Sequence, residues 1–120
     1  QTKSDTGPLK WMSPEAMQDK KYNEKTDVWS YGVTLWEIVE RKTPYGKQDV
    51  LAVAEAVCFK GLRLTLSADA DCPPALARIF ELCIRTDPAE RPTFAQIAKF
   101  LREHGDASSA ATFTAAGTRD

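Results

Sequence analysis

The stretch Thr26–Arg41, TDVWSYGVTLWEIVER, decides the fold of this chain. A surface helix carries one apolar stripe, whereas the apolar residues here leave almost no polar face. These residues are Val28, Trp29, Tyr31, Val33, Leu35, Trp36, Ile38 and Val39. The stretch is too short, and too charged at its ends, to cross a bilayer. It therefore predicts the buried central helix of an all-helical or mixed domain.

The ends of this stretch carry the signals of a helix start and a helix stop. Thr26 is a suitable N-cap, and Asp27 places an acid in the first turn, where the helix dipole favours it. Lys42 places a cation near the C-terminus, and Pro44 stops the run. We expect the central helix to cover residues 26–42.

Gly32 lies in the middle of this helix, where glycine costs about 1 kcal/mol relative to alanine. We expect another backbone to approach closely there, because close packing would offset the cost of a glycine inside a helix. Trp11, Trp29 and Trp36 are predicted to lie in the core.

Composition excludes several classes of protein. The chain has 120 residues, which suits one domain, and its 42% hydrophobic and 28% charged residues are ordinary for a globular protein. A net charge of −1 argues against nucleic acid or an anionic membrane as the main partner. No signal peptide or membrane-spanning run is visible. The chain begins at Gln1 without methionine, so we expect a fragment.

The cysteines indicate a reducing compartment. Cys58, Cys72 and Cys83 are odd in number and show no CxxC spacing, which favours free thiols inside the cell over a disulfide framework. His104 is the only histidine, so a zinc site has few ligands. No metal site is predicted.

Weaker patterns surround the central helix. They predict a loop over 1–12 and four outer helices, over 14–18, 48–57, 74–86 and 93–104. Thr93 and Gln96 form the T-x-x-Q pattern of a capping box. Residues 105–120 are rich in Ala, Ser, Thr and Gly, and we expect them to be disordered.

Three motifs occur in a fixed order: PLKWMSPE at 8–15, TDVWSYGV at 26–33 and DPAERPTF at 87–94. Together they closely resemble the C-terminal half of a protein kinase catalytic domain, in the tyrosine kinase or tyrosine-kinase-like branch. The SPE within the first motif resembles the A-P-E element that closes the activation segment. The resemblance covers about residues 6–103, and the order of the three motifs makes it specific.

The resemblance implies a fold class and a division of the chain. The fold is mainly α: the helical C-lobe of a protein-kinase-like α+β fold, truncated upstream. Residues 1–104 form the C-lobe fragment, and 105–120 form the tail. Within the fragment, 1–15 hold the end of the activation segment and the substrate loop, 26–42 the central helix, and 48–104 the outer helices.

The resemblance also assigns structural roles to charged residues. Glu15 and Arg91 are expected to form a buried ion pair, because the planar guanidinium binds a carboxylate bidentately. The alternative is two solvated charges. Asp27 is expected to accept backbone N–H groups from the catalytic loop, and the alternative is a plain first-turn acid.

Other residues lie where the family contacts its substrates. Substrate-binding residues are expected in the loop of Pro8, Leu9, Lys10 and Trp11. Ser4 and Thr6 lie where the family places phosphorylated residues of the activation loop, although ordinary polar loop residues are an equal alternative.

The chain lacks the sequence motifs of phosphoryl transfer. It has no Gly-rich loop, no V-A-I-K lysine, no H-R-D catalytic loop and no D-F-G element. We therefore expect no catalytic residue in this fragment. ATP and Mg²⁺ are expected only in the intact parent domain, and neither bound by the fragment alone. Its partners are expected to be protein substrates in the cytoplasm, or at the cytoplasmic side of a membrane-bound parent, and its oligomeric state stays open.

The identity of the acceptor hydroxyl depends mainly on Pro8. Serine/threonine kinases usually carry threonine at this position, whereas tyrosine kinases carry proline followed by an aliphatic and a basic residue. Ile84 and the absence of tyrosine from residues 1–10 favour the tyrosine-kinase-like branch instead. Tyrosine or dual specificity is predicted, with serine/threonine specificity as one alternative and a pseudokinase or scaffold as another.

Overall fold

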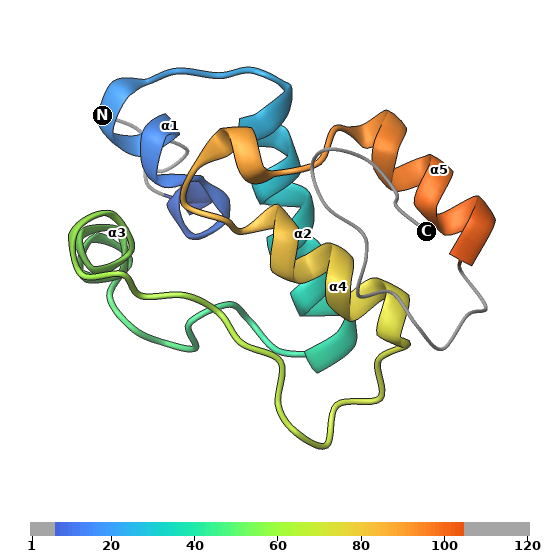
Figure 1. The fold of residues 1–120 in the computed structure, drawn as a ribbon. Helices are drawn as coiled ribbons and strands as arrows, with labels where there is room; N and C mark the ends of the chain where they lie inside the picture. Colours follow the sequence, from blue (N-terminus) through green and yellow to red (C-terminus); the bar gives the residue numbers. More distant parts are fainter. Residues whose placement is uncertain (1–6, 105–120) are drawn as a thin grey trace.

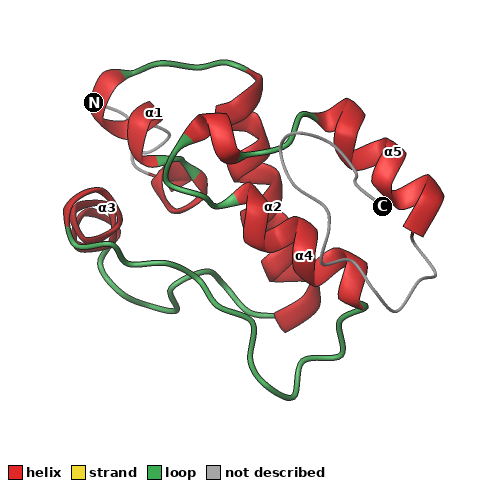
Figure 2. Cartoon of the chain, viewed as in Figure 1, coloured by secondary structure: helices red, strands yellow, loops and turns green. Residues whose placement is uncertain are grey.

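The computed structural model describes residues 7–104, which form helices joined by loops (Figure 1). Their elements are η2 (Gly7–Trp11), α1 (Pro14–Asp19), α2 (Glu24–Glu40), α3 (Val50–Phe59), α4 (Pro74–Cys83), η3 (Pro88–Glu90) and α5 (Phe94–His104). Figure 2 shows no strand in this range, so the mainly α prediction is confirmed. No helix in it is long and apolar enough to cross a bilayer.

Helix α2 runs through the middle of the molecule and packs against α4, η2 and η3 (Figure 1). Val28 and Val33 are 0% exposed, and Trp29 is 1% exposed. Burial on every side was nevertheless a wrong prediction, because Ile38 is 66% exposed. The described neighbours cover only part of the helix, and hydrophobicity alone does not reveal which side they leave open.

The N-terminus of α2 differs from the prediction. The helix is capped by Asn23, whose side chain accepts the backbone N–H of Thr26, and the Thr26 Oγ1 accepts the N–H of Asn23 at 3.0 Å. Thr26 is therefore the third residue of the helix, where it completes a capping box with Asn23, and it is not the N-cap. At the other end, Arg41 turns into the left-handed region at φ 57° and donates to the Glu37 carbonyl, so the helix stops before residue 42.

Helices α2 and α4 cross at Gly32. A β-carbon at this position would lie 2.6 Å from the Cys83 Cβ and 3.8 Å from the Cys83 carbonyl carbon. The close approach predicted from the glycine is confirmed. Burial raises the pKa of the Cys83 thiol to about 12, although the Arg91 charge opposes this, and the thiol stays neutral.

The core has two parts, and α2 contributes residues to both. The first joins α2 to α4 and α5, through Val28, Ala75, Ile79, Leu82, Cys83, Ile97 and Phe100. The second joins α2 to α3, its connecting loops and one residue of α4, through Trp29, Val33, Trp36, Tyr45, Val53, Val57, Leu64 and Phe80. Helix α2 therefore packs in both parts of the core.

The outer helices are present with shifted ends. Helix α3 covers 50–59, two residues later than predicted, because Asp49 caps it by accepting the Ala52 N–H. Helix α4 ends at residue 83, where the Arg85 N–H turns back to the Leu82 carbonyl. The capping box before α5 is confirmed, since Thr93 and Gln96 exchange hydrogen bonds of 2.8 and 3.1 Å.

Candidate functional site

The predicted substrate loop is a short 3-10 helix, η2, and not the irregular loop expected for residues 1–12. Proline fixes φ near −65°, which lies within the 3-10 range, and the Met12 N–H closes the turn on the Leu9 carbonyl at 3.1 Å. Pro8 is exposed, Leu9 is half-buried and Lys10 is buried. The exposed Pro8 therefore lies at the surface of a regular turn.

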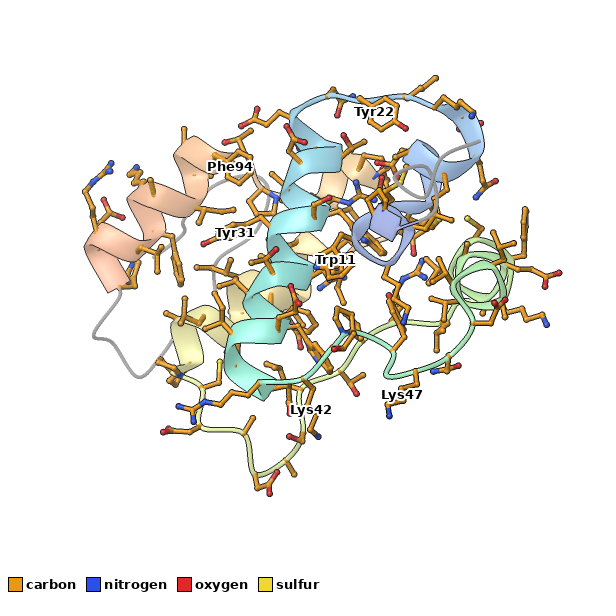
Figure 3. All side chains as sticks on the ribbon, turned by 180° about the vertical axis from the view of Figure 1, so that it is seen from behind. Trp11, Tyr22, Tyr31, Lys42, Lys47 and Phe94 are labelled. Atoms are coloured by element: carbon orange, nitrogen blue, oxygen red, sulfur yellow. The ribbon has the colours of Figure 1, made fainter. Side chains whose placement is uncertain are left out.

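Three side-chain hydrogen bonds hold η2 against the rest of the molecule. The Trp11 indole N–H donates to the Glu37 carboxylate at 2.8 Å, and the Ser30 hydroxyl donates to the Trp11 carbonyl at 2.7 Å. The Lys10 ammonium donates to the Gly46 carbonyl at 2.9 Å. Trp11 is only half-buried and lies beside α2, as Figure 3 shows. Its predicted place in the core is confirmed only in part, because Trp11 packs against the core around Trp29 while Glu37 holds its polar edge near the surface.

The predicted contact between Glu15 and Arg91 is present. The two guanidinium nitrogens donate to the two carboxylate oxygens at 2.6 and 3.0 Å, across 76 positions of sequence. The Arg91 side chain is 0% exposed and that of Glu15 is 18% exposed. This bidentate pair ties the start of α1 to the loop before α5.

The remaining donors of Arg91 are also used. Its guanidinium donates to the carbonyls of Lys25, Arg85 and Thr86 at 3.0, 2.8 and 3.3 Å. It lies 5.0 Å from the ring centroid of Trp29, a distance suited to a cation–π contact. Arg91 therefore fastens α1, α2 and the end of α4 at one point.

Two further cations of this region were missed by the sequence reasoning. The Lys25 ammonium donates a hydrogen bond to the Arg91 carbonyl at 2.6 Å. The Arg63 guanidinium lies 5.1 Å from the Trp29 ring centroid. The Trp29 indole nitrogen is buried and has no hydrogen-bond partner among the described residues. No sequence motif predicts the contact of Lys25, because its acceptor is a backbone carbonyl, which every residue has.

Asp27 lies in the first turn of α2, and its side chain is exposed. The hydrogen bonds found within residues 7–104 do not involve its carboxylate, so its predicted role toward a catalytic loop stays a prediction. Ser4 and Thr6, like the tail 105–120, lie outside the described residues.

Residues that could hold Mg²⁺ are not gathered in the described part of the chain. No cluster of three or more His, Cys, Asp or Glu side chains occurs there. The described residues therefore do not fit a magnesium site, and no chemical step is assigned to them.

Comparison with known proteins places these features in a family. A profile of the protein tyrosine and serine/threonine kinase family matches residues 1–101. This chain is a member of that kinase family. The matched span includes η2, the ion pair and the whole of α2, so the resemblance stated from the three motifs is confirmed.

Named kinases are similar to this chain over most of its length. It is 41% identical over 98 residues to mitogen-activated protein kinase kinase kinase 10 of Homo sapiens, with 82% of this chain and 10% of the relative covered. It is 41% identical over 101 residues to serine/threonine-protein kinase CTR1 of Arabidopsis thaliana, with 84% of this chain and 12% of the relative covered. It is 38% identical over 107 residues to serine/threonine-protein kinase STY17 of the same plant, with 86% of this chain and 18% of the relative covered. The kinase chain thus spans about a tenth to a fifth of these relatives.

The ion pair makes the stability of the kinase chain depend on pH. Burial alone would raise the pKa of Glu15, but hydrogen bonds from Arg91 and the backbone, with the Arg91 charge, lower it below its ordinary 4.5. A lowered pKa stabilises the folded state above the unfolded pKa, and this contribution is lost as pH falls through the folded pKa. Urea denaturation from about pH 7 to about pH 3 should show a loss of stability that is smaller in Glu15→Gln. Glu55→Gln, at an exposed position of α3, is the control and should keep the pH dependence of the unmodified chain.

Proposed function

We propose that this chain is the substrate-side part of the C-lobe of an ATP-dependent protein kinase. The observation that carries the proposal is the exposed turn η2, which three side-chain hydrogen bonds hold on α2 and on the loop before α3. A surface that positions an acceptor protein must be rigid, because misplacement of the reacting groups lowers the rate. Family membership supports the same reading.

Each predicted residue has a role in this proposal. Pro8 and the accessible parts of Leu9 and Trp11 contact the acceptor protein, and Lys10 holds the 3-10 turn in place through its bond to the Gly46 carbonyl. Glu15 and Arg91 fix the end of this segment against α2. Asp27 presents an exposed carboxylate at the N-terminal end of α2, available to the N–H groups of another segment.

ATP and Mg²⁺ supply the phosphoryl group and its charge neutralisation in kinases of this family. We propose that they bind to parts of an intact domain other than residues 7–104, in the interior of the cell. The residues of this chain orient the acceptor hydroxyl, and we assign none of them to the transfer of the phosphoryl group. Ser4 and Thr6 remain proposed sites of phosphorylation.

The proposed acceptor is serine or threonine. The plant relatives CTR1 and STY17 are named serine/threonine-protein kinases, and their similarity extends across more than four fifths of this chain. The second candidate is tyrosine or dual specificity. It is favoured by Pro8 in the exposed turn, where a serine/threonine kinase usually carries threonine.

A chimeric kinase tests this function. Residues 1–101 of the chain would replace the equivalent segment in the catalytic domain of human mitogen-activated protein kinase kinase kinase 10. We expect ATP-dependent phosphorylation of a peptide array, mainly at serine and threonine. Phosphate mainly on tyrosine would support the second candidate. An inactive chimera that melts like the active parent domain would contradict the proposed function.

A pseudokinase or scaffold is the remaining alternative. Sequencing the transcript that encodes the chain distinguishes an active kinase from a pseudokinase. An active kinase needs a lysine for the nucleotide, a catalytic aspartate and a magnesium-binding aspartate. We expect the transcript to encode all three. Substitution of all three by other residues would favour a binding module.

A further inference from the structure

A cavity of about 690 Å³ lies between the end of α2, the loop before α3 and the segment that follows α3. Trp36, Tyr45 and Leu64 supply its apolar surface, and Lys42, Lys47 and Arg63 supply cations. Thr43, Gly46 and Thr65 complete the lining, which includes no carboxylate. Its volume lies within the range of about 300–1,000 Å³ that is typical of small-molecule sites, although the cavity is largely open to solvent.

The lysines are the cations available to a ligand. Arg63 uses its guanidinium within the protein, donating to the Val57 carbonyl at 3.0 Å and to the Thr86 hydroxyl at 2.7 Å. Lys42 and Lys47 are exposed, and the hydrogen bonds and ion pairs found among residues 7–104 leave their ammonium groups unused. Figure 3 shows Lys42 just beyond the end of α2 and Lys47 on the loop that leads to α3.

Polar groups in the cavity wall are satisfied internally. The Trp36 indole N–H donates to the Thr65 carbonyl at 2.8 Å, and the Gly46 N–H donates to the Thr43 carbonyl at 3.1 Å. The Gly46 carbonyl accepts the Lys10 ammonium. A ligand therefore meets an apolar surface with unpaired positive charge at its rim, and not a set of free backbone groups.

A neighbouring cavity provides a contrast within the same molecule. It has a volume of about 380 Å³ and shares Leu64 and Thr65 with the first. Its other lining residues are Leu66, Ala77, Phe80, Glu81 and Ile84, which include one carboxylate and no cation. An apolar ligand could enter either cavity, whereas an anion is attracted only to the first.

We propose that the larger cavity binds an amphipathic organic anion. Its flat or extended apolar group packs on Trp36 and Tyr45, and its carboxylate or phosphate lies between Lys42 and Lys47. This site is independent of the proposed kinase function, because it requires neither nucleotide nor acceptor protein. The same chemistry occurs in a free aryl or alkyl acid and in an acidic peptide that carries an aromatic residue.

Titration of the 120-residue chain with 4-phenylbutyrate, followed by ¹H–¹⁵N correlation NMR, tests the proposal. The Trp36 indole N–H and the amides of Thr43 and Gly46 should shift with one dissociation constant. The neutral amide 4-phenylbutanamide should bind about 5-fold more weakly, because it cannot form ion pairs with the two exposed ammonium groups. Acetate, which lacks the apolar group, should leave these signals unchanged.

Substitutions separate the charge from the shape of the cavity. Lys42→Gln with Lys47→Gln should weaken 4-phenylbutyrate about 5-fold and leave the neutral amide unaffected. Lys99→Gln, at an exposed position of α5, is the matched control and should change nothing. Equal affinity for acid and amide, an unaltered double variant, or shifts centred on Ala77 and Glu81 would each overturn the proposal.

A second arm distinguishes the two sources of the anion. The probe is the blocked tripeptide Glu-Phe-Glu, titrated under the same conditions. Tighter binding than that of 4-phenylbutyrate supports the site with an acidic protein segment as its ligand. Weaker binding supports it with a free acid as its ligand, and in both cases the lysine double variant must lose affinity.

Discussion

Replacing Arg91 with alanine should lower the free energy of unfolding of this kinase chain by about 3–5 kcal/mol, the cost of breaking a buried ion pair from one side. The guanidinium is 0% exposed and donates to both carboxylate oxygens of Glu15. Alanine leaves that carboxylate and the carbonyls of Lys25, Arg85 and Thr86 without their donor. Such a loss is a large part of the roughly 5–15 kcal/mol that stabilises a small domain.

Urea denaturation of the chain, monitored by tryptophan fluorescence, measures this loss. Arg91→Lys keeps the charge but not the planar fork, so we expect it to recover only a small part of the stability. Arg102→Ala, at an exposed position of α5, is the control and should cost less than about 0.5 kcal/mol. An unfolding midpoint that is unchanged in Arg91→Ala would show that the pair contributes nothing.

Gly32→Ala is expected to lower the free energy of unfolding by about 2 kcal/mol, although alanine is the better helix former by about 1 kcal/mol. The added β-carbon would lie 2.6 Å from the Cys83 Cβ. Both atoms are attached directly to backbones of packed helices, so neither can rotate away. Relief requires α2 and α4 to move apart, which loosens both parts of the core.

A second substitution isolates this contact. Cys83→Ala keeps the β-carbon and should not rescue Gly32→Ala, whereas Cys83→Gly removes it and should restore part of the stability. Thr34→Ala, on the exposed side of α2, should leave the thermal melting temperature nearly unchanged. If Gly32→Ala melts at or above the temperature of the unmodified chain, the close packing of α2 on α4 is refuted.

Local chemistry explains which parts of the fold were predictable. The apolar density of residues 26–41 identified the central helix, because so much hydrophobic surface must be buried somewhere. Gly32 indicated the crossing with α4, since a mid-helix glycine has a cost that close packing offsets. Thr93 and Gln96 marked the start of α5, because a capping box depends only on neighbours three positions apart.

Other features depend on competition or on distant segments. Asn23 and Thr26 both suit an N-cap, and the pattern alone did not show that they act together in one box. Exposure of Ile38 depends on which elements pack on α2. Lys25 and Arg63 bind backbone carbonyls, which carry no sequence signal. The Glu15–Arg91 contact was foreseen from family resemblance and not from the residues themselves.

The separation between Glu15 and Arg91 has a consequence for how the chain folds during synthesis. At about 5–20 residues per second, a ribosome needs roughly 4–15 s to add the 76 positions that separate them. For that interval the carboxylate of Glu15 stays solvated, and α1 has no charged anchor on the rest of the molecule. Helices α1 to α4 are synthesised first. The loop before α5, which carries Arg91, then forms the ion pair with Glu15. Any ribosomal pause before Arg91 is added therefore prolongs the time for which α1 lacks its ion pair with the loop before α5.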